Sequence, residues 1–242
     1  MKIFHLLAIC LCFAWSCTTL YIPNRINVPE LQKKGDLRMS ASMGFDGTNL
    51  QAAYAVNSRI GILANYYTVE QREYQSNFLR GGGAGLEVGA GYFRAPKNYI
   101  FESYATIGYG SLYHRSQDFY TPGIINNLDA SFWRLGLQSS ASVRLDVLSL
   151  SAMLRINQMN YYNIQSPNDT PYINDGQRLR EDNTHYFVEP GVQAALGYKN
   201  IRFNLQLQRS WHLGQSWFDY DKIHYSAGVQ LAFNVFKKEK DR

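Results

Sequence analysis

The chain has 242 residues, a formal net charge of +5 and 18% charged residues. Its one notable apolar stretch, residues 3–14, is too short to cross a bilayer as a helix, which excludes a helical membrane protein. The modest, dispersed positive charge gives no reason to expect nucleic acid as a partner, and the 18 Tyr and 19 Gly favour β structure.

Residues 1–16 have the pattern of a secretory signal peptide, with Lys2 ahead of the apolar stretch. All three cysteines lie within the first seventeen residues, and Cys17 stands at the expected cleavage point. The segment Ala14-Trp15-Ser16-Cys17 loosely matches a bacterial lipobox, so we predict that Cys17 becomes an N-terminal residue that carries lipid. Cleavage by an ordinary signal peptidase, which would leave an unmodified thiol, is the alternative.

Residues 17–36 are predicted to form a lipid-anchored, extended linker. Pro23, Pro29 and Gly35 interrupt any regular element there, and Lys33-Lys34 adds charge. We therefore expect this stretch to connect the lipid anchor to a folded domain without packing into it.

From residue 37 to residue 236, apolar and polar residues alternate with a period of two, which predicts strands with one apolar and one polar face. Most of the predicted strands approach the ~9–11 residues of a tilted transmembrane strand. They cover residues 37–45, 50–56, 59–66, 84–92, 99–109, 133–144, 148–157, 188–198, 201–208 and 225–236. Residues 237–242 form a charged C-terminal tail.

Short connections between these strands alternate with long polar ones. The long connections cover residues 68–82, 115–129, 163–184 and 213–223. Short turns at one rim and long loops at the other are typical of a bacterial outer-membrane barrel with both termini periplasmic. The predicted fold is an all-β, antiparallel, up-and-down transmembrane barrel of about ten strands, with eight or twelve as alternatives. A soluble lipocalin-like barrel also remains, because its strands alternate too.

A short motif carries a family resemblance. Cys17-Thr18-Thr19, followed by Tyr21-Ile22-Pro23-Asn24, Val28-Pro29 and alternating strands, resembles a group of small outer-membrane barrel lipoproteins of the Bacteroides type. The resemblance implies the fold and an outer-membrane location. It implies no chemistry, since the group has no established activity.

Charged residues on the polar face are expected to fill the lumen as a network of ion pairs and hydrogen bonds. Ten strands enclose a narrow interior, and lone buried charges are costly. The predicted network consists of Arg134, Arg144, Arg155, Arg202, Glu87, Glu102 and Glu189. With Arg38 and Arg59, which fall on the same face, the arginines outnumber the glutamates six to three. A charged path for solutes is the alternative interpretation.

Three histidines form a candidate site at the long-loop end. Strand parity points His185, His212 and His224 inward, with His212 and His224 as expected cross-strand neighbours and His185 on the next strand. They are candidates for a metal site, a proton-sensitive gate or an acid–base pair. The alternative is that they hydrogen-bond within the barrel mouth.

Motifs of soluble enzymes are missing from the sequence, including a phosphate-binding glycine loop, His-Glu-x-x-His and Cys-x-x-Cys. We therefore expect no cofactor and a non-enzymatic barrel that presents long surface loops, contacts outer-membrane lipid and belongs to an outer-membrane protein complex. An enzyme acting on lipid or peptide at the outer rim, and a narrow solute pore, are the alternatives.

Overall fold

The computed structural model describes residues 20–72, 80–117, 125–167, 175–198, 200–214, 217–218 and 220–236. The predicted signal peptide, Cys17 and the charged tail lie outside these ranges. Among the described residues, no helix combines the length and the apolar character needed to cross a membrane.

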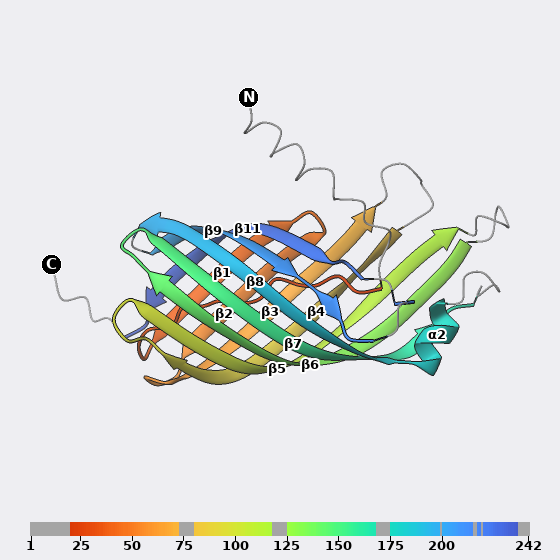
Figure 1. The fold of residues 1–242 in the computed structure, drawn as a ribbon, viewed down its shortest axis with the longest axis horizontal. Coiled ribbons are helices and arrows are strands. Elements are labelled where there is room, and N and C mark those ends of the chain that lie inside the picture. Colours follow the sequence, from red (N-terminus) through yellow and green to blue (C-terminus); the bar gives the residue numbers. More distant parts are fainter. Residues whose placement is uncertain are drawn as a thin grey trace, which may run out of the picture.

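The described chain folds into one closed antiparallel barrel (Figure 1). The elements are β1 (Asp36–Gly44), β2 (Gly47–Ala55), β3 (Ile60–Arg72), β4 (Arg80–Arg94), β5 (Tyr99–Gln117), β6 (Ile125–Arg144), β7 (Leu148–Gln165), α2 (Asp175–Glu181), β8 (Thr184–Tyr198), β9 (Ile201–Arg209), β10 (Trp211–His212) and β11 (Ile223–Asn234). Consecutive strands pair from β1 to β9, β9 pairs with β11, and β11 pairs with β1. The predicted fold class, an antiparallel barrel of about ten strands, is confirmed.

The two-residue strand β10 continues the path of β9 along β8. Gly191 faces Gln208 on β9 and Val188 faces Trp211 on β10, so both strands keep one register on β8. The interruption falls at Ser210. The ring therefore has ten strands, and β10 extends the ninth rather than adding another.

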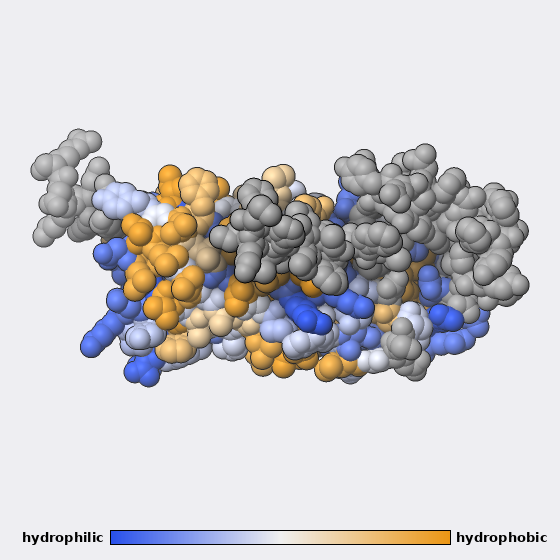
Figure 2. Space-filling view, turned by 45° about the horizontal axis from the view of Figure 1, so that its top comes forward, coloured by the Kyte–Doolittle hydropathy of each residue, from blue (hydrophilic) through white to orange (hydrophobic). Residues whose placement is uncertain are grey.

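The apolar face of each strand points outward. On β9, Phe203 and Leu205 are each 66% exposed, whereas Asn204 and Gln206 are each 3% exposed. Apolar residues gather on the barrel wall in Figure 2, mostly towards the end opposite α2. This inside-out distribution is that of a barrel surrounded by lipid.

The two ends of the barrel differ. The end with the short connections, here called the short-turn end, joins β2 to β3, β4 to β5, β6 to β7 and β8 to β9. The other, here called the loop end, carries the longer connections, α2 and the tight turn from β1 to β2 (Figure 1).

Strands β5, β6 and β7 are longer than the sequence predicted. They have 19, 20 and 18 residues, against nine in each of β1, β2 and β9. A 19-residue strand rising ~3.4 Å per residue and tilted by ~40° spans about 50 Å, twice the ~25 Å apolar band of such barrels.

The extra length lies at the loop end, where the strands continue into stretches predicted as loops. β5 runs to Gln117 within the predicted loop 115–129. The outward face carries Ile107 and Tyr109, which are 56% and 58% exposed, and continues with Ser111, Tyr113 and Arg115. The paired strands therefore stay together beyond the apolar band and form a wall, here called the β5–β7 wall.

Candidate functional site

Residues 20–35, here called the lumen segment, run through the barrel interior from the loop end to the short-turn end (Figure 1). At the loop end, Tyr21 forms an isolated parallel bridge with Tyr220. At the short-turn end, the Gly35 N–H donates to the Ala55 carbonyl oxygen at 2.9 Å. The chain then turns back as β1.

The prediction that residues 17–36 form an unpacked linker is wrong for the lumen segment. Ile26 and Leu31 have no exposed surface, and Ile26 packs with Val28 and Met153 in an apolar cluster. The prolines do keep the segment free of regular structure, but the surrounding strands bury it. The barrel interior is thus a core built around its own N-terminal segment.

Amide side chains of the wall satisfy the segment's backbone. The Gln206 side chain accepts from the Ile26 N–H and donates to the Ile26 carbonyl oxygen, both at 3.0 Å. The Gln51 side chain donates to the Arg25 carbonyl oxygen at 3.0 Å, and the backbone N–H of Arg25 donates to the Asn49 side-chain oxygen at 3.1 Å. A buried extended segment without strand neighbours needs such partners. This requirement accounts for the Asn and Gln on the polar face.

Four members of the predicted network form two ion pairs around the lumen segment. Arg155 donates to Glu189 at 2.6 Å, and Arg134 pairs with Glu87, with every one of these side chains no more than 1% exposed. Both arginines also reach Asn24 of the lumen segment, Arg134 at its side-chain oxygen and Arg155 at its carbonyl oxygen, each at 2.8 Å. The two pairs therefore hold the segment as well as each other.

The remaining members of the predicted network have other partners. Arg202 pairs with Glu30 of the lumen segment at 2.9 Å, and Ser149 donates to the same carboxylate at 2.6 Å. Glu102 accepts from the backbone N–H groups of Glu30 and Leu31 at 3.0 and 2.9 Å. Glu102 thus anchors backbone rather than an arginine.

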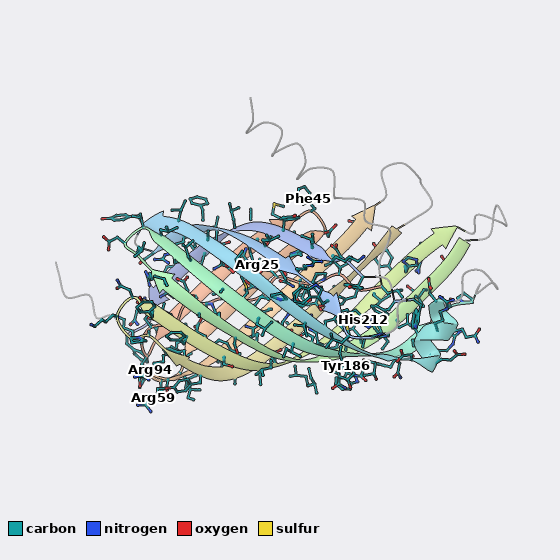
Figure 3. The ribbon with its side chains drawn as sticks, viewed as in Figure 1. Arg25, Phe45, Arg59, Arg94, Tyr186 and His212 are labelled. Carbon is teal, nitrogen blue, oxygen red and sulfur yellow. The ribbon has the colours of Figure 1, made fainter. Side chains whose placement is uncertain are left out.

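Two other arginines lie near the short-turn end. Arg144 is half-buried, and its N–H donates to the Asn98 carbonyl oxygen at 2.8 Å. Arg59, which parity placed inward, is exposed in the β2–β3 turn (Figure 3). Figure 3 shows Arg25 further along the barrel, where it donates to Gln193 at 2.7 Å.

Sequence reasoning missed the lumen segment's own functional side chains, namely Tyr21, Asn24, Arg25 and Glu30. One signal was present: strand parity assigned six arginines but only three glutamates to the polar face, which pointed to a carboxylate from elsewhere in the chain. Glu30 supplies it to Arg202.

Two of the three candidate histidines come together at the loop end. His185 Nδ1 lies 3.1 Å from His212 Nε2, and the His185 ring lies 3.9 Å from the Phe218 ring. His224, which was expected beside His212, instead faces Gln208 on β9. That expectation is wrong because β11 begins at Ile223, which pairs with Arg209 at the end of β9. His212 lies further along the chain in β10, which pairs with β8 beyond the start of β11.

Within the described ranges, no three His, Cys, Asp or Glu side chains are placed to hold a metal ion. The His185 and His212 rings use facing nitrogens on each other and lie among aromatic rings. At the mouth, the His212 ring also lies 4.9 Å from the Phe218 ring and 5.1 Å from the Phe187 ring.

Aromatic rings close the mouth of the barrel above the lumen segment. Tyr21 stacks on Phe187 with ring centroids 4.0 Å apart, and Phe187 lies 5.9 Å from Phe218. Phe218 is only 3% exposed although it lies in the connection between β10 and β11. The Tyr161 hydroxyl completes the closure by donating to the Leu20 carbonyl oxygen at 3.1 Å.

A pair of carboxyl groups lies at the rim beside this closure. Asp46 is in the β1–β2 turn, and Asp221 precedes β11 and donates its N–H to the Tyr21 carbonyl oxygen at 2.9 Å. Burial, together with the neighbouring Asp46 carboxylate, raises the pKa of Asp221 to about 7. Burial also raises the pKa of Asp46.

Comparisons with known proteins give matches among solved structures, at low sequence identity. No family model and no curated protein match the chain. Among solved structures, it is similar to the KdgM porin, with 12% identity, a TM-score of 0.39, and coverage of 82% of this chain and 99% of that one. For the translocator domain of autotransporter NalP from Neisseria meningitidis, the identity is 8% and the TM-score is 0.47, with coverage of 82% of this chain and 86% of that one. For LpxR from Salmonella typhimurium, the identity is 10% and the TM-score is 0.38, with coverage of 82% of this chain and 100% of that one.

The class of the protein is set by its own closed sheet, apolar outside and polar inside: it is a ten-stranded β-barrel of the outer-membrane type. Its distinguishing feature is a lumen filled by its own N-terminal segment.

Proposed function

We propose that the protein is a lipid-anchored outer-membrane barrel with a structural or interaction role, not an enzyme and not an open pore. The observation that supports this is the filled lumen, in which Asn24 and Leu31 have no exposed surface. In this proposal the short-turn end faces the periplasm, the loop end faces the cell exterior, and Cys17 carries lipid.

The filled lumen disfavours the alternative of a solute pore. Conduction would require the lumen segment to leave, which breaks the contacts of Glu30 with Arg202 and of Asn24 with Arg134 and Arg155. The enzyme alternative loses its basis as well, because the His185–His212 pair lies among aromatic rings at the closed mouth.

The β5–β7 wall is the surface proposed to act. It rises past the apolar band on one side of the loop end and carries polar residues outward, such as Ser111, Arg115 and Asp129. Paired strands hold this surface rigid, so it can present a fixed face to another outer-membrane protein.

The test combines conductance with gel mobility. The purified protein should run faster on an SDS gel unboiled than boiled and should give no conductance steps in planar bilayers. An Asn24→Gly/Glu30→Gln variant, which loosens the lumen segment, should give steps, whereas the lipid-facing Leu205→Ala should not. Steady conductance of the unaltered protein would contradict the proposal.

The interaction role has a separate measurement. Cross-linking from an Arg115→Cys variant on the wall should capture one outer-membrane protein in stoichiometric amount, and a Leu205→Cys variant on the β9 side should not. Equal, unspecific capture by both variants would contradict a partner at the wall.

A further inference from the structure

The direction of the lumen segment separates the two ends of the described chain. Leu20 lies at the loop end, in an apolar cluster with Tyr161 and Phe218. Asn234, the last residue of β11, lies at the short-turn end, because it pairs with Asp36 at the start of β1. This departs from the expectation that both termini lie at the same, periplasmic end.

The reach of the chain then limits where Cys17 can lie. Three steps along the chain separate Cys17 from Leu20. At no more than ~3.6 Å per residue, they span at most about 11 Å, less than half of the ~25 Å apolar band. The lumen is occupied by the lumen segment itself, so no second path through the barrel leads back to the short-turn end.

The rim beside the start of the segment is low and apolar on its outer side. Asp221 connects Tyr21 to this rim, through its N–H to the Tyr21 carbonyl oxygen and through its carboxyl group to Asp46. The chain neighbours of Asp46 on the outer surface are Phe45 (Figure 3) and Met43, and these side chains are 89% and 67% exposed. The start of the lumen segment thus lies next to a rim that borders lipid.

We propose that the N-terminal lipid anchor enters the leaflet at the loop end, which is the outer, cell-surface leaflet in the proposed orientation. The barrel then displays its own acylated N-terminus on the cell surface, with the lumen segment as the connection through the membrane. This inference rests on the proposed function for the lipid on Cys17 and for the orientation, and it adds the side on which the lipid lies.

The occupied lumen also limits how the barrel can assemble. An acylated cysteine is too bulky to pass a lumen in which Ile26 and Leu31 are fully buried. The N-terminus must therefore reach the outer side before the wall packs around the segment.

The experiment places one epitope tag at three positions of the full-length protein and measures antibody binding on intact and on permeabilised cells. The test position is between Thr18 and Thr19. The matched controls are between Asp182 and Asn183 at the loop end, and between Asn57 and Ser58 at the short-turn end. Incorporation of a fatty-acid label is measured in parallel, with Cys17→Ser as its control.

The expected result is antibody binding on intact cells for the test position and the loop-end control, and binding only after permeabilisation for the short-turn control. Binding at the test position only after permeabilisation, with the controls as expected, would overturn the inference. Both controls behaving in reverse would overturn the proposed orientation. Surface binding without fatty-acid label would overturn the lipid anchor, and with it the lipid placement inferred here.

Discussion

Replacing Glu189 with Gln removes the charge that compensates a fully buried arginine. Glu189 Oε2 accepts from Arg155 at 2.6 Å and from Asn157 at 2.8 Å. Its Oε1 accepts from the Tyr21 hydroxyl at 2.8 Å and from Ser210 at 2.9 Å. The side chains of the ion pair are both 0% exposed, so solvent gives no substitute for the lost charge.

The cost follows from the burial of the pair. Removing one partner of a buried ion pair destabilises a protein by about 3–5 kcal/mol. Arg115 and Asp129 form a matched pair at the loop end, with two hydrogen bonds of 2.8 and 2.9 Å but side chains 33% and 49% exposed. Exposed pairs contribute about 0.2–1 kcal/mol to the free energy of unfolding. Asp129→Asn should therefore cost at least about 2 kcal/mol less than Glu189→Gln, which is a factor above ten in the unfolding equilibrium constant.

The assay is urea unfolding of the purified barrel in detergent micelles, followed by tryptophan fluorescence and by gel mobility. Glu189→Gln should lower the unfolding midpoint far more than Asp129→Asn. A Glu189→Gln/Arg155→Gln double variant should be more stable than Glu189→Gln alone, because no charge is left buried without a partner. Equal shifts for the two single variants would refute the argument that burial sets the cost.

Three further predictions test the lumen, the rim and the mouth. A Cβ at Gly61 would lie 2.7 Å from Leu31 Cδ1, so Gly61→Val should displace the lumen segment and cost about 1–3 kcal/mol in urea unfolding; an unchanged midpoint would contradict the packing. Burial and the Asp46 carboxylate raise the pKa of Asp221 to about 7. The Asp221 carboxyl group therefore keeps a proton in the folded state that it releases at about pH 4 in the unfolded state. Stability should therefore fall as pH rises from about 4 to 7 and level off above, and Asp221→Asn should flatten this fall in melting curves. His185→Ala should lower the melting temperature without changing Zn²⁺ affinity in calorimetry, and a loss of tight Zn²⁺ binding would restore the metal hypothesis.

The strands and their faces could be predicted because each strand carries its own signal. Alternation fixes which residues point outward, and a slip by one residue would expose the polar set to lipid. The sequence alone predicts that Phe203 and Leu205 point outward and that Asn204 and Gln206 point inward, as the structure shows. The prediction of about ten strands follows in the same way, since turn residues bound each run of alternation, and the closed sheet decides between ten and the alternatives of eight and twelve.

The length of β5, β6 and β7 could not be predicted from the same signal. Beyond Tyr109 the outward positions hold Ser111, Tyr113 and Arg115, so the aliphatic half of the alternation ends where the strand leaves the apolar band. Pairing continues regardless, as in the partnership of Arg115 with Asn127 on β6. Polar strand and polar loop look alike in sequence, and long-range pairing decides between them.

The lumen segment escaped prediction for a related reason. Pro23 and Pro29 with scattered apolar residues are typical of an extended chain in water, and the same composition suits an extended chain inside a polar tube. What distinguishes the two is the wall, where Gln51 and Gln206 donate to backbone carbonyl oxygens of the segment. Those amides could equally have faced water, so only the charge imbalance hinted at an internal partner.

The placement of Glu30 shows why a filled lumen bears on function. Its carboxylate accepts from Arg202 on β9 and Ser149 on β7, and its backbone N–H donates to Glu102 on β5. One residue of the lumen segment thus binds three separate strands of the ring. These contacts fill the lumen and link strands on different sides of the barrel. Removing the segment would leave Arg202 buried without its carboxylate partner. With the lumen occupied, the outer surface is the part of the barrel that can meet other molecules, and in the proposed function that surface is the β5–β7 wall.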